Sequence, residues 1–111
     1  MKKVYIAHPL RGAEQTEMDV IAGNIAHVDD VCRKIAEERP DVLILSPIHA
    51  FCFVSPLGPQ DWVLDQCRHL LNVADEVWVY GDHRNSEGCR MEIEHAQSLG
   101  IPVFDKSEDL G

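Results

Sequence analysis

The feature that most constrains this chain is an alternation between short apolar runs and longer amphipathic segments. The apolar runs are rich in β-branched and aromatic residues, as strands are, and cover residues 3–7, 42–45, 76–80 and 101–104. The segments between them repeat apolar residues every three or four positions, as helices do, and cover residues 16–39, 61–74 and 86–99. Strands alternating with helices predict an α/β architecture with right-handed crossovers and a mostly parallel sheet.

The boundaries of these segments carry their own signals. Thr16 and Asp19 are placed like a helix capping box, and Pro40 stops the same helix. The second strand is apolar at every position, which is typical of a strand buried on both faces of a parallel sheet. We therefore expect a Rossmann or flavodoxin-like three-layer sandwich, with a four- to five-stranded sheet in the order 2-1-3-4. A single domain is expected over residues 1–105, followed by a C-terminal tail, 106–111.

Residues 46–60 are too long for a simple connection and are predicted to form a lid or an interface loop. The segment Phe51-Cys-Phe-Val54 is too apolar for a free loop in a monomer, and Trp62 beside it is expected at a subunit contact. Trp78, in the middle of a strand, is expected in the core. The chain is therefore predicted to form a homodimer or a higher homo-oligomer.

Charge and composition exclude several classes of partner. The 111 residues carry 10 Lys and Arg against 19 Asp and Glu, a net charge of −9, which repels nucleic-acid polymers and anionic membranes. No apolar stretch approaches the roughly 20 residues of a membrane span, so we expect neither a membrane anchor nor a signal peptide. The four cysteines contain no C-x-x-C pair, which favours reduced thiols in the cytoplasm.

Ligands of an open parallel sheet bind beyond the carboxyl ends of its strands, near the point where the strand order reverses. Here that point lies between the first and third strands. Polar residues and glycines follow three strands and are expected to meet at this edge: His8, Arg11, Gly12, Ser46, His49, Asp82, His83, Ser86 and Gly88. Asp29 and Asp30 lie inside a helix instead and are predicted to face solvent.

Gly88, Glu92 and Ala96 are four residues apart and share one helix face. This spacing predicts an anion cradle at the start of the helix with a carboxylate one turn behind it. Such a carboxylate is suited to attack an anomeric carbon or to stabilise an oxocarbenium ion. The alternative is a solvated Glu92 beside Glu87 and Glu94 on the surface.

Two other candidates also have simpler explanations. Ser86 is either a phosphate ligand or only the cap of the last helix. Arg11 either clamps a phosphate or forms an ion pair with one of the many carboxylates.

Several segments resemble the nucleoside 2-deoxyribosyltransferase-like superfamily, especially its small bacterial and phage members. They are Val4-Tyr-Ile-Ala-His-Pro-Leu-Arg-Gly12, Leu70-Leu-Asn-Val-Ala-Asp-Glu-Val-Trp-Val-Tyr-Gly81, Ser86-Glu-Gly-Cys-Arg-Met-Glu92, Ala96 and Leu99-Gly-Ile-Pro-Val103. The resemblance implies Rossmann-like subunits in a homodimer or larger assembly, with active sites near subunit contacts. It also implies a nucleoside or nucleotide as substrate.

The resemblance also implies roles for individual residues. Glu92 matches the nucleophile that attacks the anomeric carbon of the sugar, and Tyr5 matches the tyrosine that orients it. Related deoxynucleoside-monophosphate N-hydrolases hold the 5′-phosphate with residues that match Arg11, Gly12, Ser86 and Gly88.

One position departs from the pattern of the catalytic relatives. They commonly carry an aspartate eight residues before the position of Asp75, where it protonates the leaving base, and this chain has Cys67. Asp65, a candidate catalytic residue, and Asp61, a candidate substrate-binding residue, lie on another helix face and would need a register change to replace it.

Two histidines are the remaining candidates for the general acid, because an imidazole titrates near neutral pH. They are His8 and His49, and His49 is also a candidate substrate-binding residue.

Three hypotheses of function follow. The first is an enzyme of the N-glycosidic bond, a hydrolase or a deoxyribosyltransferase, that needs no cofactor. The second is a non-catalytic module that binds a nucleotide or nucleotide-sugar, because the usual acid is missing. The third is a metal site lined by His8, His49 and His83, although their spacing matches no compact metal motif.

Overall fold

The computed structural model describes residues 1–11 and 18–107 of the chain. The elements follow one another in the order β1 (Lys2–Ala7), α1 (Met18–Glu38), β2 (Val42–Leu45), α2 (Pro47–Ala50), α3 (Asp61–Leu71), β3 (Glu76–Val79), the 3-10 turn η1 (His83–Asn85), α4 (Glu87–Ser98) and β4 (Val103–Asp105). This order confirms the predicted alternation of strands and helices.

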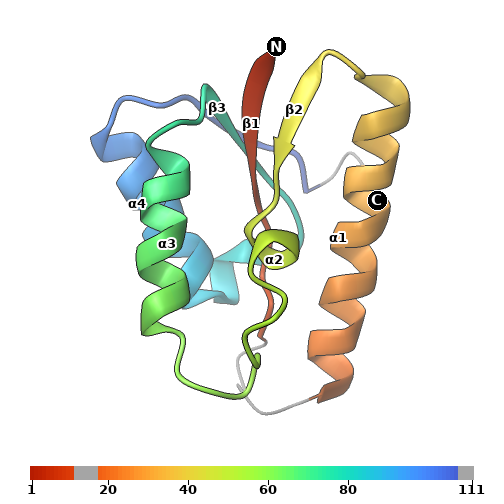
Figure 1. Cartoon of the computed structure of the whole chain (residues 1–111), viewed down its shortest axis with the longest axis vertical. Coiled ribbons are helices and arrows are strands. Elements are labelled where there is room, and N and C mark those ends of the chain that lie inside the picture. Colours follow the sequence, from red (N-terminus) through yellow and green to blue (C-terminus); the bar gives the residue numbers. More distant parts are fainter. Residues whose placement is uncertain (12–17, 108–111) are drawn as a thin grey trace.

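The four strands described form one parallel sheet in the order β2-β1-β3-β4, as predicted (Figure 1). In the centre of the sheet, Tyr5 of β1 lies opposite Leu45 of β2 and Val77 of β3. All carboxyl ends of the strands therefore point to the same edge, which is also where α2 begins.

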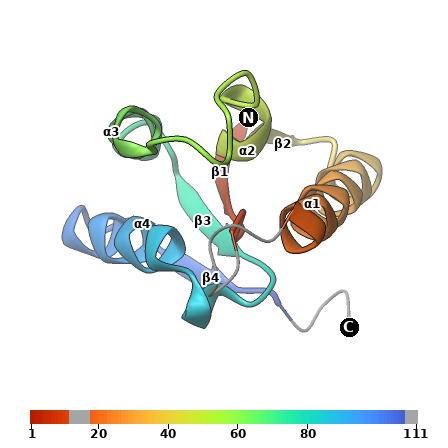
Figure 2. The same cartoon turned by 90° about the horizontal axis from the view of Figure 1, so that it is seen from below.

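The helices cover both faces of the sheet, so the predicted three layers are confirmed. α1 lies on one face, and α3 and α4 lie on the other (Figure 2). Alternate residues of β1 serve the two cores: Val4 and Ile6 pack with residues of α1, whereas Tyr5 and Ala7 pack with residues of α3 and α4. Trp78 is only 4% exposed and belongs to the α1 side, as expected for a core residue.

Some boundaries differ from the prediction. The loop 46–60 opens with the short helix α2, which is too short to show periodicity but has Pro47 at a helix start, where the fixed φ of proline fits. β4 begins at Val103 instead of residue 101, because Pro102 has no N–H to donate to a ladder. The predicted cap Thr16 lies outside the described residues.

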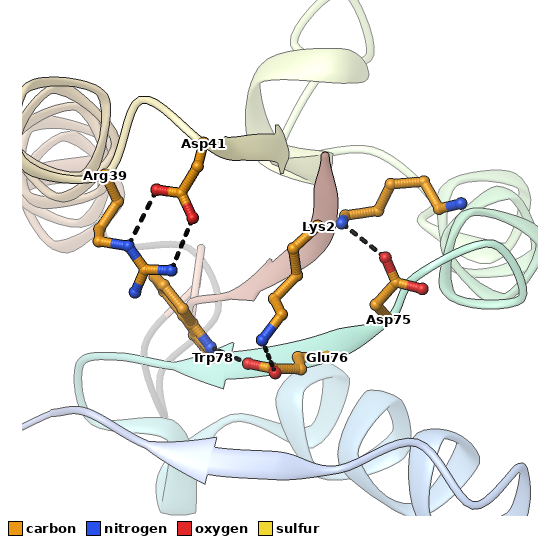
Figure 3. Close-up of polar contacts among 7 residues, drawn as sticks. Lys2, Arg39, Asp41, Asp75, Glu76 and Trp78 are labelled. Atoms are coloured by element: carbon orange, nitrogen blue, oxygen red, sulfur yellow. Dashed lines mark hydrogen bonds and ion pairs between the residues drawn. The ribbon is translucent and has the colours of Figure 1, made fainter.

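Polar contacts brace the opposite, amino-terminal edge of the sheet (Figure 3). The Lys3 backbone N–H donates to the Asp75 carboxylate at 2.8 Å, and the Lys2 ammonium pairs with Glu76 at 2.6 Å. Glu76 also accepts a hydrogen bond from the Trp78 indole. Exposed ion pairs contribute at most about 1 kcal/mol each, so these contacts order the strand ends and add little to stability.

Three further features bear on the predictions made from the sequence. Among the residues described, no helix combines the length and apolar character that a membrane crossing requires. All four cysteines are free. Phe53 and Trp62, at and after the long loop, are 73% and 52% exposed.

Gly81 brings the ends of β1 and β3 together. Its φ is +72°, and a Cβ at this position would lie 3.1 Å from both His8 Nε2 and Pro9 Cδ. Gly100 has nearly the same φ, +74°, but nothing within 4 Å of its virtual Cβ. The two glycines therefore share a left-handed conformation, and only Gly81 also allows a close approach.

Substitution by alanine should lower the free energy of unfolding by different amounts at Gly81 and Gly100. Gly100→Ala should lower the free energy of unfolding by about 1 kcal/mol, the strain of a left-handed alanine. Gly81→Ala should cost about 1–3 kcal/mol more, because its methyl group overlaps the loop after β1. Urea unfolding of both variants measures the difference, and equal losses would contradict the close approach.

Candidate active site at the carboxyl edge of the sheet

The two residues with the strongest functional resemblance meet inside the molecule. Tyr5 is fully buried in β1 and faces the layer of α3 and α4. Glu92 lies in the second turn of α4, whose start is capped by Ser86: its hydroxyl accepts from the Cys89 N–H at 3.2 Å. Ser86 thus acts as a helix cap here, and the cap holds the turn that presents Glu92.

The Glu92 carboxyl is a buried acid. The residue is partly exposed as a whole, but Oε2 is buried and has no hydrogen-bond partner among the described residues, and the same is true of the Tyr5 hydroxyl. Burial raises the pKa of Glu92 to about 7, and the nearby Tyr5 hydroxyl opposes this by lowering it. Burial and the charge of Glu92 raise the Tyr5 pKa well above its ordinary value. These facts contradict the alternative of a solvated surface Glu92.

A cavity of about 170 Å³ opens in front of this acid, and Glu92 is the only carboxylate among the described residues that line it. Apolar side chains of the loop 46–60 form much of its wall, together with His8, His49 and Cys67. The volume is below the roughly 300 Å³ at which ordinary ligand pockets begin. It therefore suits one part of a ligand, such as a sugar ring, next to the carboxyl.

The helix α3 turns Cys67 toward the acid. Burial, helped by the charge of Glu92, raises the pKa of the Cys67 thiol to about 12, so this thiol is too weak an acid to protonate a leaving base near neutral pH. Asp61 and Asp65 are exposed, and Asp65 lies 3.8 Å from His69 on the outer surface of α3. Neither aspartate lines the cavity, in agreement with their different helix face.

His8 lies at the cavity with both ring nitrogens engaged. Nδ1 is 2.7 Å from the Pro9 carbonyl, which only accepts, so Nδ1 carries the proton. Nε2 lies 2.7 Å from His27 Nδ1, and therefore accepts from it. Burial lowers the pKa of His8 to about 4, so the ring is neutral at pH 7 and orders the loop after β1.

His49 lies between two polar partners. Its Nδ1 is 2.6 Å from the Ser46 hydroxyl, and its Nε2 contacts the Asp29 carboxylate. Asp29 is predicted to face solvent, and its side chain is 43% exposed, but α1 packs so that its carboxylate also reaches His49 in α2. Sequence spacing shows the Ser46 and His49 pair on one helical turn, whereas Asp29 comes from a separate element and could be found only from the packing.

The predicted phosphate ligands do not gather at the cavity. Arg11 donates from Nε to the Pro56 carbonyl at 2.6 Å and from Nη2 to the Gly58 carbonyl at 2.5 Å, and so ties the long loop to the end of β1. A Cβ on Gly88 would make only ordinary contacts, the nearest at 3.8 Å. Neither Ser86 nor Gly88 is among the residues that line the cavity, and Gly12 lies outside the described residues.

The hypothesis of a histidine metal site is not supported. His83 contacts Asp105 at 2.9 Å, while His8 contacts His27 and His49 contacts Asp29. The three histidines thus have separate partners. Within the described part of the chain, no group of three His, Cys, Asp or Glu side chains is arranged to hold a metal ion.

Comparison with solved structures supports the fold. A solved 2-deoxyribosyltransferase from the psychrotolerant bacterium Bacillus psychrosaccharolyticus, described as a biocatalyst for the synthesis of antiviral and antitumoral nucleosides, superposes with a TM-score of 0.66. The sequence identity is 21%, and the match covers 95% of this chain and 73% of that chain. The deoxyribosyltransferase-like fold is therefore confirmed.

The sequence comparisons add the family. No curated protein matches the sequence. The family model described as "Domain of unknown function (DUF7768)" matches residues 2–106, which is nearly the whole chain. This protein therefore belongs to the DUF7768 family.

Proposed function

We propose that this protein acts on the N-glycosidic bond of a nucleoside, a deoxynucleoside or its 5′-monophosphate, with Glu92 as the nucleophile. One observation carries the proposal: the Glu92 carboxyl is buried beside Tyr5 at a cavity, with Oε2 unpaired among the described residues. A buried carboxyl without a partner is costly to keep for structure alone, and such acids concentrate at reaction sites.

In the proposed reaction a Glu92 oxygen forms a bond to C1′ of the sugar while the bond from C1′ to the base breaks. The bonding electrons leave with the base, which must gain a proton. Water then hydrolyses the glycosyl ester in a hydrolase, or a second base displaces Glu92 in a transferase. Tyr5, buried beside the carboxyl, keeps the nucleophile in one orientation and offers a hydroxyl where charge changes.

The leaving base must also receive a proton from a side chain at the cavity. Cys67 replaces the usual aspartate, and its raised pKa keeps it protonated. His49 lines the cavity, and its Nε2 contacts the Asp29 carboxylate, which fixes the imidazole at the edge of the site. His8 is less suited, because burial lowers its pKa to about 4 and keeps its ring neutral near pH 7. We therefore propose His49 as the general acid.

Cys67 in place of the usual aspartate also supports a second candidate, a module that binds a nucleoside or nucleotide without cleaving it. Cys67 lines the cavity, and binding needs no acid. A bound ligand would stabilise the folded state according to its concentration and affinity. Thermal unfolding with and without ligand therefore separates binding from turnover.

The first prediction of this proposal concerns Glu92. Incubation with a panel of deoxynucleosides and their 5′-monophosphates should release free base, measured by liquid chromatography. Glu92→Gln should reduce that rate on the order of 10³-fold or more, because an amide cannot replace the carboxylate nucleophile. Glu94→Gln is the matched control, since Glu94 is exposed on the same helix, and its rate should equal that of the wild type.

The outcomes divide the two candidates. If a panel member stabilises the protein against heat but its base is not released, the binding module is the correct candidate and the enzyme is not. If no member of the panel stabilises the protein and none releases its base, both candidates are overturned.

The second prediction concerns pH and needs no substrate. The pKa of Glu92 is about 7 in the folded protein and near 4.5 in an unfolded chain. Between these values the folded state keeps a proton that the unfolded state has lost, so this group makes stability fall as pH rises from about 4.5 to 7. Glu92→Gln should remove that fall.

The measurement is urea unfolding of wild type, Glu92→Gln and Glu94→Gln at several pH values from 4.5 to 8. The stability of Glu92→Gln relative to the wild type should increase across this range, and that of Glu94→Gln should stay constant. A constant difference for Glu92→Gln would show that its carboxyl is solvated.

A third prediction concerns assembly. We propose a homodimer or higher homo-oligomer in the cytoplasm, because Phe53 and Trp62 form an exposed aromatic contact with ring centroids 6.1 Å apart and the free cysteines suit a reducing compartment. Light scattering at micromolar concentration should show an oligomer, and Phe53→Ser should shift it toward the monomer. A wild-type monomer at these concentrations would contradict the proposal.

A further inference from the structure

We infer that Ser46, His49 and Asp29 form a second catalytic site, a serine hydrolase triad for small apolar carboxylic esters. It differs from the Glu92 site in nucleophile, bond type and cavity, and shares His49 with it. Its three side chains come from two elements and are hydrogen-bonded in series.

The series has the geometry of an activated nucleophile. The Ser46 hydroxyl lies 2.6 Å from His49 Nδ1, and His49 Nε2 contacts the Asp29 carboxylate. A carboxylate accepts hydrogen bonds, so it selects the tautomer with the proton on Nε2. Nδ1 then carries a lone pair aimed at the Ser46 hydroxyl, which is the requirement for a general base.

The roles of the two ring nitrogens are exchanged relative to the chymotrypsin template, in which serine contacts Nε2. The chemistry requires one nitrogen on the nucleophile and the other on the carboxylate, and either assignment satisfies it. Triads are recognised by these roles and not by sequence order.

A purely structural explanation would make Ser46 a helix cap. Ser46 is the N-cap residue of α2, but its side chain makes no capping hydrogen bond. Its hydroxyl is directed to the imidazole instead. The Asp29 carboxylate reaches the imidazole from α1, although Asp29 is 20 residues away in sequence, so the arrangement is not a local feature of the turn.

The nucleophile has access to its own cavity, of about 500 Å³, within the usual range of ligand pockets. Ser46 and His49 supply polar groups to it, and Ile44, Leu45 and Leu70 supply apolar wall. Only His49 also lines the Glu92 cavity. The apolar wall favours a short aliphatic acyl group over a charged one.

Cys32 also lines this cavity, close to Ser46 and Asp29. Burial raises the pKa of its thiol, and the charge of Asp29 raises it further, despite an opposing contact with Ser46. The thiol is therefore protonated near neutral pH, and the thiolate is the form that attacks. Ser46, which has a base in contact, is the better nucleophile of the two.

The reaction balances with water as the second reactant. Ser46 Oγ bonds to the ester carbonyl carbon while its proton passes to His49 Nδ1, and Asp29 stabilises the resulting imidazolium. The bond to the alcohol breaks, and that oxygen takes the proton from His49. Water then attacks the acyl serine, again giving a proton to His49, and releases the carboxylic acid and the Ser46 hydroxyl.

The test uses the whole chain and two probes. A fluorophosphonate, which phosphonylates activated serines, should label the wild type, and peptide mass spectrometry should place the label on Ser46. p-Nitrophenyl butyrate should be hydrolysed with an initial burst of nitrophenol. Ser46→Ala and His49→Ala should lose labelling and slow hydrolysis by about 10²-fold or more.

Asp29→Asn tests the positioning of His49 without removing a nucleophile or a base. It should slow labelling and shift the pH profile of hydrolysis. Ser98→Ala is the matched control, because Ser98 is an exposed serine that only contacts the His95 carbonyl, and it should leave both readouts unchanged.

Two outcomes would overturn the triad: wild-type protein that the fluorophosphonate does not label, or a label that persists in Ser46→Ala. Circular dichroism of each variant shows that a loss comes from the missing side chain and not from unfolding. Release of base from nucleosides is measured separately, so failure of the triad leaves the Glu92 proposal standing, and the converse also holds.

Discussion

The central strand β1 is the constraint on which the rest of the structure depends. It pairs with β2 and β3 along both edges and is packed on both faces, so each of its side chains has one available direction. Val4 and Ile6 must enter the core under α1, and Tyr5 must enter the layer of α3 and α4. A shift of β1 by one residue would exchange the two sets of side chains and move the Tyr5 hydroxyl away from the Glu92 carboxyl.

That constraint also explains the chemistry of the site. Because Tyr5 is held in the sheet, α4 can place a carboxyl against it only by burying that carboxyl, and burial is the main cause of its raised pKa. The protein carries a large negative charge, but the pKa of this acid is raised mainly by the loss of water around it and not by the overall field. The loop after β1 is fixed by other means, through His8, His27 and the contact with Gly81.

Much of the fold could be predicted because its signals are local. The apolar run Val42–Leu45 predicted a strand, and the order of the strands came from the doubly wound α/β pattern. The prediction that this strand is buried on both faces was wrong, because β2 lies at the edge of the sheet and Leu43 is 45% exposed. The helix α2 was missed because four residues show no period. For the site, the resemblance to deoxyribosyltransferases pointed to Tyr5 and Glu92. Arg11, a candidate for a phosphate clamp or an ion pair, donates to loop carbonyls, and no signal in the sequence indicated these contacts.

By itself, the sequence determined the architecture and which titratable and nucleophilic groups the chain offers, because periodicity and residue type are properties of neighbouring positions. The tertiary structure decided which of these groups meet. Asp29 reaches His49 only because α1 packs beside the end of β2, and Asp65 faces away because α3 turns Cys67 inward. Contacts of this kind depend on how whole elements pack, and the spacing of residues along one element does not contain that information.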